Sequence, residues 1–138
     1  MDVEPLQLDL DWDWLIILDA CRYDYFARLW KKSKVEPRLS PASCTLGFLD
    51  WLPKIDNSVV ITGHPFVFQY KEKFTEIIDA GFDDNLNTTP PWYITRVLRN
   101  RYAYVSQFKR KILWFLQPHN PLIGEPRLDV GIFTDPRT

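Results

Sequence analysis

Residues Trp14–Leu18 form a continuous apolar run (Trp-Leu-Ile-Ile-Leu) that ends in a carboxylate, Asp19. A run without polar alternation is typical of a central strand of a parallel sheet, which is covered on both faces. In the following segment, Cys21–Lys32, apolar residues recur at the spacing of one helix face: Tyr23, Phe26, Ala27 and Trp30. The stretch therefore predicts a strand, a short turn and an amphipathic helix, which is the beginning of a βα unit.

The rest of the chain continues the alternation of strands and helices. We expect strands at Ser58–Thr62 and Ile112–Leu116, and a short helix at Thr45–Leu52 that is stopped by a proline. The segment Phe74–Ala80 fits no single element type. A longer helix begins after Thr88-Thr89-Pro90-Pro91; it turns apolar residues inward (Tyr93, Ile94, Val97, Leu98, Tyr104, Val105 and Phe108) and arginines outward (Arg96, Arg99 and Arg101). This order predicts one α/β domain over residues 1–138, with a mostly parallel sheet and helices on both faces.

Composition narrows the class of protein. The 138 residues suffice for one domain, and an apolar content of 46% excludes a disordered chain. Seventeen Lys and Arg against eighteen Asp and Glu leave a net charge of −1, which disfavours nucleic acid as a partner. We interpret the basic stretch Arg96–Lys111 as a solvated helix face. No apolar run approaches the roughly 20 residues of a membrane span, so we expect a soluble, cytoplasmic protein without a membrane partner.

Polar residues follow the expected strands at the edge of the sheet where α/β proteins bind ligands. They are Asp19, the turn Thr62-Gly63-His64, and His119. A carboxylate directly after a buried strand is placed for a metal or phosphate site. The alternative is that Asp19 caps the helix that begins near Cys21.

Thr45 opens a helix after a Ser-rich loop. A hydroxyl at the positive end of a helix dipole is stabilised as a nucleophile, although a helix cap explains the same position. Cys44 is the alternative nucleophile at this turn. His119 lies in a proline-rich loop and is a candidate general acid or anion contact, unless it is structural. His64 has the same position after a strand, in a weaker context.

Five segments in order resemble the alkaline phosphatase superfamily, and in particular archaeal sulfatase-like proteins. They are WDWLIILDACRYDY (Trp12–Tyr25), SPASCTLGFLDW (Ser40–Trp51), VVITGHPFV (Val59–Val67), TTPPWYIT (Thr88–Thr95) and LQPHNPLIGEP (Leu116–Pro126). The resemblance implies that Asp19 is a metal ligand and that Thr45 is both a ligand and the nucleophile. It implies that His119 contacts the sulfate or phosphate, or protonates the leaving group. The activity implied is metal-dependent hydrolysis of a small anionic ester, a phosphoester or sulfoester, with Zn²⁺, Ca²⁺, Mg²⁺ or Mn²⁺.

The sequence departs from this family in two ways. The Cys-x-Pro-Ser-Arg signature of sulfatases is replaced by Cys44-Thr45-Leu46-Gly47-Phe48, so we expect no formylglycine at Cys44. The later Asp-His pair that completes the metal site is missing as well, so the chain resembles a truncated, N-terminal half of the family's domain. One hydroxyl and one carboxylate are a poor cage for a divalent ion.

Because of these departures, a second interpretation stays open in addition to a hydrolase. In this interpretation the chain is a non-catalytic α/β binding or interaction module, either a truncated relative or half of a split enzyme. Its aromatic content of 15%, with six Trp, exceeds what a small interior readily holds. We therefore expect some rings at the surface, where a homo-oligomer or a complementary chain would cover them.

Overall fold

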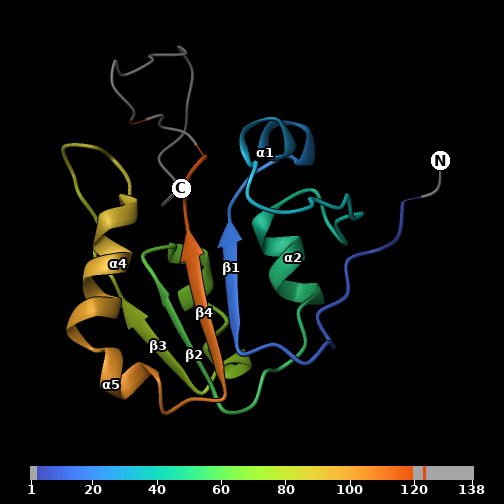
Figure 1. The fold of residues 1–138 in the computed structure, drawn as a ribbon. Coiled ribbons are helices and arrows are strands. Elements are labelled where there is room, and N and C mark those ends of the chain that lie inside the picture. Colours follow the sequence, from blue (N-terminus) through green and yellow to red (C-terminus); the bar gives the residue numbers. More distant parts are fainter. Residues whose placement is uncertain (1–2, 120–122, 124–138) are drawn as a thin grey trace.

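The computed structural model describes residues 3–119 and 123. Within them a four-stranded sheet runs in the order β1-β4-β2-β3, and each neighbouring pair is parallel (Figure 1). The strands are β1 (Trp14–Leu18), β2 (Ser58–Thr62), β3 (Glu76–Asp79) and β4 (Arg110–Phe115). This confirms an α/β fold with a parallel sheet, and it assigns the ambiguous segment Phe74–Ala80 to a strand.

Helices and one short 3₁₀ turn lie between the strands. They are α1 (Tyr23–Leu29), α2 (Thr45–Trp51), α3 (Pro65–Phe68), the 3₁₀ turn η1 (Lys71–Lys73), α4 (Pro91–Asn100) and α5 (Tyr102–Val105). The helix expected after Thr88 is thus two helices, which meet at Arg101. None of the helices in the described part of the chain is long and apolar enough to cross a membrane.

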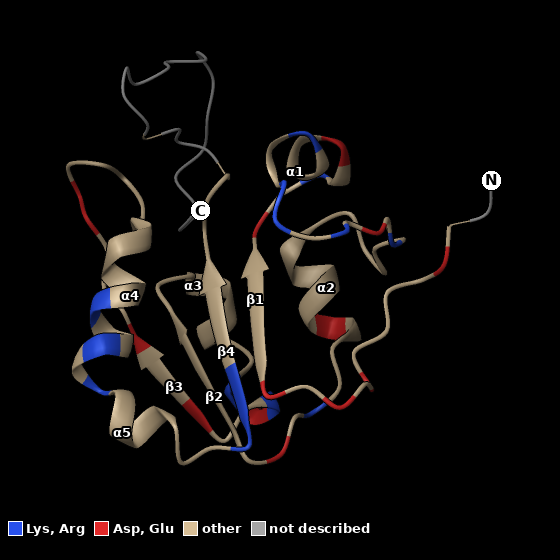
Figure 2. Cartoon of the chain, viewed as in Figure 1, with Lys and Arg blue, Asp and Glu red and all other residues tan. Residues whose placement is uncertain are grey.

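The core consists of two clusters, one on each face of the sheet. Alternate residues of β2 contribute to them, because successive side chains of a strand point to opposite faces. Val60 packs with α2 and α3, while Val59 and Ile61 pack with α4 and α5. The outer side of α4 carries exposed arginines, visible in Figure 2, as expected for a solvated basic face.

The prediction that Trp14–Leu18 is a central strand covered on both faces is wrong. Among residues 3–119 and 123, β1 pairs only with β4 and so forms one edge of the described sheet. Leu15 and Ile17 pack against the cluster that includes α2, but on the other face Ile16 is 60% exposed. The all-buried strand is instead β2. An apolar run does not separate these cases, because a strand buried on one face and bare on the other can have the same composition.

The prediction that the first helix buries one apolar face is also wrong. α1 is shorter than Cys21–Lys32 and buries no residue. Tyr23 and Trp30 are 47% and 39% exposed, and Trp30 stacks on Phe26 of its own segment with ring centroids 5.4 Å apart. These residues do lie in and next to a helix, as their spacing predicts, but no other part of the described structure covers them.

Candidate functional site

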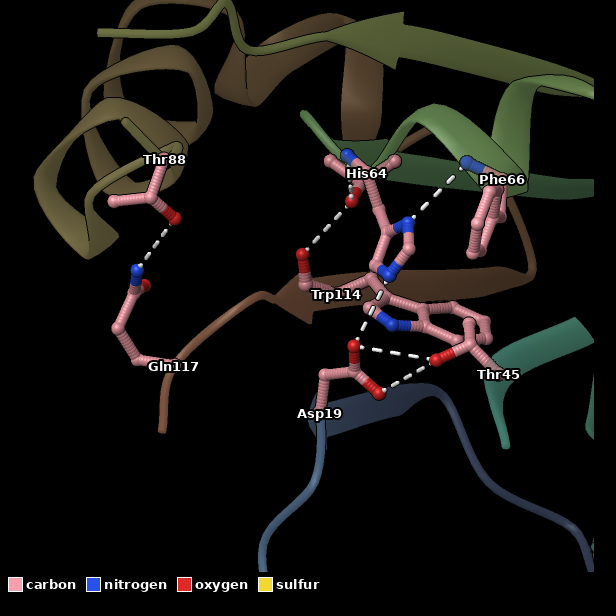
Figure 3. A network of polar contacts seen from close by, with 8 residues as sticks. Asp19, Thr45, His64, Phe66, Thr88, Trp114 and Gln117 are labelled. Carbon is pink, nitrogen blue, oxygen red and sulfur yellow. Dashed lines mark hydrogen bonds and ion pairs between the residues drawn. The ribbon is translucent and has the colours of Figure 1, made fainter. Parts of the chain in front are cut away.

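Three polar side chains meet at the carboxyl ends of β1 and β2 (Figure 3). Asp19 directly follows β1, His64 lies two residues after β2, and Thr45 is the first residue of α2. Asp19 and His64 point to the same face of the sheet because every second residue of a strand lies on one face. Asp19 shares a face with Leu15 and Ile17, which pack with the α2 side of the core. His64 shares that same face through Val60.

Local backbone structure fixes the Asp19 carboxylate. The β1–β4 ladder extends one residue beyond the strand, because the backbone N–H of Asp19 donates to the carbonyl of Phe115 at 3.0 Å. Ala20 then turns the chain with a φ of 60°, and the N–H of Cys21 donates back to Leu18. The carboxylate is therefore held at the strand end and directed toward α2.

Asp19 is the centre of the polar cluster. The hydroxyl of Thr45 donates to its carboxylate, with Oγ1 lying 3.1 Å from Oδ1 and 3.3 Å from Oδ2. His64 Nε2 lies 3.0 Å from Oδ2. The side chains of His64 and Asp19 are 4% and 12% exposed, so this contact is shielded from water. The carboxylate therefore accepts hydrogen bonds from two side chains that lie far from it in the sequence.

The tautomer of His64 follows from its neighbours. Its Nδ1 accepts the backbone N–H of Phe66 at 3.2 Å, and this contact caps α3. Nδ1 therefore carries the lone pair, and Nε2 carries the proton that points at Asp19. A neutral imidazole in this tautomer orients the carboxylate and leaves the second carboxylate oxygen facing Thr45.

Gly63 permits the turn that brings His64 to the site. A Cβ at this position would overlap the side chain of Thr89 and lie 2.5 Å from the carbonyl oxygen of Gly81. The turn therefore packs directly against the loop that precedes α4, where any larger residue would force the two apart.

Neither Asp19 nor Thr45 caps a helix, so the capping alternative is wrong for both. The N-cap of α1 is Arg22, without a side-chain cap bond, and Arg22 pairs instead with Asp24 at 2.8 Å. The N-cap of α2 is Cys44, whose Sγ accepts the N–H of Gly47 at 3.4 Å. The Thr45 hydroxyl is thereby left to contact Asp19.

A cavity of about 640 Å³ opens beside the cluster. Its volume lies within the range of small-molecule sites. Polar residues of the lining include Asp19, Thr45, Cys44, Ser43 and Ser40. Apolar residues form the remaining wall, among them Leu8, Leu15, Phe48, Phe66 and Trp114. The cavity is thus polar at the strand ends and apolar away from them.

His119 lines the same cavity, as the sequence prediction requires for a residue that contacts the ligand. Its backbone N–H donates to the carbonyl of Leu116 at 2.8 Å. The neighbouring Pro121, on which the expectation of a stiff loop partly depended, lies outside the described residues. The residue that sequence reasoning ranked too low is His64. A signal for it was available, since it follows Val60 and Thr62 at strand spacing, just as Asp19 follows Ile17.

The cluster offers few protein donors to a metal ion. Among the described residues no group of three or more His, Cys, Asp and Glu could hold an ion. The Thr45 hydroxyl and Nε2 of His64 each lie 3.0–3.3 Å from an oxygen of the Asp19 carboxylate. For Nε2 of His64 to bind an ion, its proton would have to move to Nδ1, which accepts the N–H of Phe66. Asp19 and Thr45 by themselves would leave most positions around a divalent ion to water or substrate.

We found no significant match to this chain among family models, curated proteins or solved structures.

Proposed function

We propose that the chain hydrolyses a phosphoester or sulfoester, with Thr45 as nucleophile and Asp19 as the group that takes its proton. The observation that carries this proposal is the contact of the Thr45 hydroxyl with the Asp19 carboxylate at the polar end of the cavity. A hydroxyl needs an adjacent base to act as a nucleophile near neutral pH. The five-segment resemblance to sulfatase-like hydrolases supports Thr45 as the nucleophile, although it implies a metal-binding role for Asp19.

The residues supply most of the reaction geometry. Oγ1 of Thr45 attacks the phosphorus or sulfur atom, its proton passes to Oδ1 of Asp19, and the bond to the departing alcohol breaks. His64 holds Oδ2 and so keeps Oδ1 directed at Thr45. In this proposal His119, which lines the cavity, protonates the alcohol oxygen. Water then cleaves the ester on Thr45 and restores the hydroxyl.

The residues that would hold a divalent ion (Zn²⁺, Ca²⁺, Mg²⁺ or Mn²⁺) are Asp19 and Thr45, and His64 would join them only after its proton moved from Nε2 to Nδ1. When bound, such an ion lowers the pKa of a coordinated hydroxyl and offsets the charge of the ester oxygens. It would also reduce the repulsion between the Asp19 carboxylate and an anionic substrate.

The test is hydrolysis of p-nitrophenyl phosphate and p-nitrophenyl sulfate by the purified chain, with each metal supplied in turn and bound metal measured by mass spectrometry. We expect turnover that Thr45→Val abolishes and Thr45→Ser retains, because Val keeps the shape of Thr without its hydroxyl. Thr95→Val, at an exposed position of α4, is the matched control. Absence of both metal and turnover in the folded wild-type chain contradicts the proposal.

The structure also favours a second candidate function, self-association through β1. This edge strand exposes Ile16, at 60%, beside Trp14, which is 38% exposed and stacks on Tyr102 of α5. Exposed apolar edge strands readily pair with another chain. Acidic residues precede β1 (Asp9, Asp11 and Asp13), while basic residues lie in and after α1 (Arg28, Lys31 and Lys32).

Figure 2 shows acidic residues before β1 and basic residues around α1, at opposite ends of the strand. Antiparallel pairing of β1 with β1 of a second copy would bring these two ends together. Asp11 and Asp13 already pair with Lys109 and Arg110 of the same chain, so the exposed apolar edge carries this candidate function. We expect a concentration-dependent dimer in sedimentation velocity that Ile16→Lys dissociates and Trp92→Lys, on exposed α4, does not. A wild-type chain that stays monomeric up to high micromolar concentration contradicts this function.

A further inference from the structure

The buried indole of Trp114 carries a donor without a partner. Trp114 is 1% exposed, and its Nε1 is one of two buried side-chain polar atoms in the described residues that lack a hydrogen-bond partner. The other, Oε1 of Gln117, belongs to a residue that does not line the cavity. Indole N–H groups in protein interiors normally find an acceptor, so an orphaned one beside a cavity indicates a site for a ligand atom.

The sheet register places this indole beneath the polar cluster. On β4, Trp114 pairs with Ile17 of β1 and with Thr62 of β2. These partners lie two residues before Asp19 and His64, so Trp114 lies on the same face, between the two strands that carry them. Trp114, Asp19 and Thr45 all line the cavity. Figure 3 shows the indole between the His64 ring and Thr45.

The indole is held in a fixed position. The carbonyl of Trp114 accepts the Thr62 hydroxyl at 2.9 Å, which anchors the backbone in addition to the ladder on both sides. The ring packs edge-on against Phe48, with centroids 5.8 Å apart. A donor held in this way loses little conformational freedom when a ligand binds, which favours binding.

The polar side chains beside it are already engaged with one another. Thr45 and the Nε2–H of His64 both donate to Asp19. The indole N–H, in contrast, has no acceptor among the described residues. Because the nitrogen is buried, a ligand oxygen reaches it from the polar end only when the side chains that cover it move aside. Its counterpart on such a ligand is an oxygen acceptor, and the apolar wall beyond it, with Leu8, Leu15 and Phe66, accommodates a group without charge.

We infer that Trp114 is a substrate-binding residue whose Nε1–H donates to a non-bridging oxygen of a phosphate or sulfate monoester with an apolar alcohol group. The inference rests on the proposed function, which it deepens by naming the substrate class. A charged sugar or nucleotide ester fits less well, because the wall offers its alcohol part few polar partners.

The experiment follows the indole N–H signals of the full chain labelled with ¹⁵N-tryptophan while inorganic phosphate is added, with Mg²⁺ present. The chain has six such signals. Trp114→Phe identifies one of them directly. Replacing Trp12, Trp14, Trp30, Trp51 and Trp92 by Phe one at a time identifies it by elimination, so the test survives if Trp114→Phe does not fold.

We expect the Trp114 signal to move downfield and saturate, while that of exposed Trp92 stays in place. Folded Trp114→Phe should bind phosphate about tenfold more weakly, as expected for loss of one hydrogen bond to a charged group. In the hydrolysis assay the KM for p-nitrophenyl phosphate should be lower than that for glycerol phosphate; kcat is not compared, because p-nitrophenolate is the better leaving group with any enzyme.

The outcomes separate this inference from the proposed function. A Trp114 shift without hydrolysis supports the oxyanion contact and contradicts only the catalysis. Hydrolysis with an unmoved Trp114 signal overturns the inference and leaves the catalysis standing. Absence of any shift up to 50 mM phosphate overturns the inference as well.

Discussion

The contact between His64 and Asp19 should be the strongest polar interaction that holds the site together. His64→Asn removes it selectively, because Asn retains an acceptor near Nδ1 for the N–H of Phe66 but cannot reach Asp19. The bond lost is 3.0 Å long, nearly buried and made to a charged group. Such hydrogen bonds contribute about 1.5–3 kcal/mol. We therefore expect the free energy of unfolding to fall by about 2 kcal/mol.

His64→Gln tests the other nitrogen. Its side-chain amide extends toward Asp19 but leaves the Phe66 N–H without the Nδ1 acceptor. The loss is then that of a neutral helix cap, about 1 kcal/mol. The two variants should thus differ in stability, with the larger loss in His64→Asn.

Urea unfolding followed by circular dichroism measures these differences, and a double-mutant cycle with Asp19→Ala isolates the pair. We expect a coupling energy of about 1.5–3 kcal/mol for His64 and Asp19. The control cycle uses Arg22 and Asp24, whose side chains are 69% and 48% exposed although their atoms lie only 2.8 Å apart. Solvent screening limits that coupling to about 0.5 kcal/mol. Equal couplings in the two cycles would refute the reasoning that burial makes the His64 contact strong.

Three further outcomes follow from packing and burial. Gly63→Ala should lower the free energy of unfolding by about 3 kcal/mol or prevent folding, because its Cβ would overlap the threonine side chain of the loop before α4; thermal unfolding measures this, and a wild-type midpoint contradicts it. Ile61→Ala, at a fully buried site, should cost about 3 kcal/mol in urea unfolding, whereas Ile16→Ala, at a position 60% exposed, should cost below about 1 kcal/mol. Burial raises the pKa of the Cys21 thiol, so at pH 8 iodoacetamide should label exposed Cys44 before Cys21; equal labelling rates by mass spectrometry would argue against this.

Local sequence patterns predicted most of the helices and strands. The strand at Ser58–Thr62 and the start of α2 at Thr45 agree with the sequence prediction. β4 begins two residues before the predicted Ile112, at Arg110. Such elements are set by apolar runs, by proline stops and by helical spacing, all of which act over a few residues. The interpretation as a sulfatase-like hydrolase remains a prediction that the hydrolysis assay tests.

The candidate site was predictable in part. The preference of ligand sites for strand ends placed Asp19, the turn at His64 and His119 at one edge of the sheet, whereas Thr45 was singled out as the start of a helix and by the resemblance. The direct contact of Asp19 with Thr45 did not follow from that rule, because an N-cap explained each residue equally well. His64 was ranked below His119 because the proline-rich context of His119 was more distinctive. The pairing of His64 with Asp19 depends on β4 lying between β1 and β2.

The sequence alone determined the parallel α/β class and the residue types that end its strands, since both depend on local pattern and on strand spacing. Only the tertiary structure decided the order of the strands. An apolar run such as Trp14–Leu18 has the same composition at an edge as in the centre, and long-range packing makes the choice. That order leaves Ile16 bare and inserts β4 between the strands that carry Asp19 and His64. It thereby places the indole of Trp114 under their contact, where no local pattern could have located it.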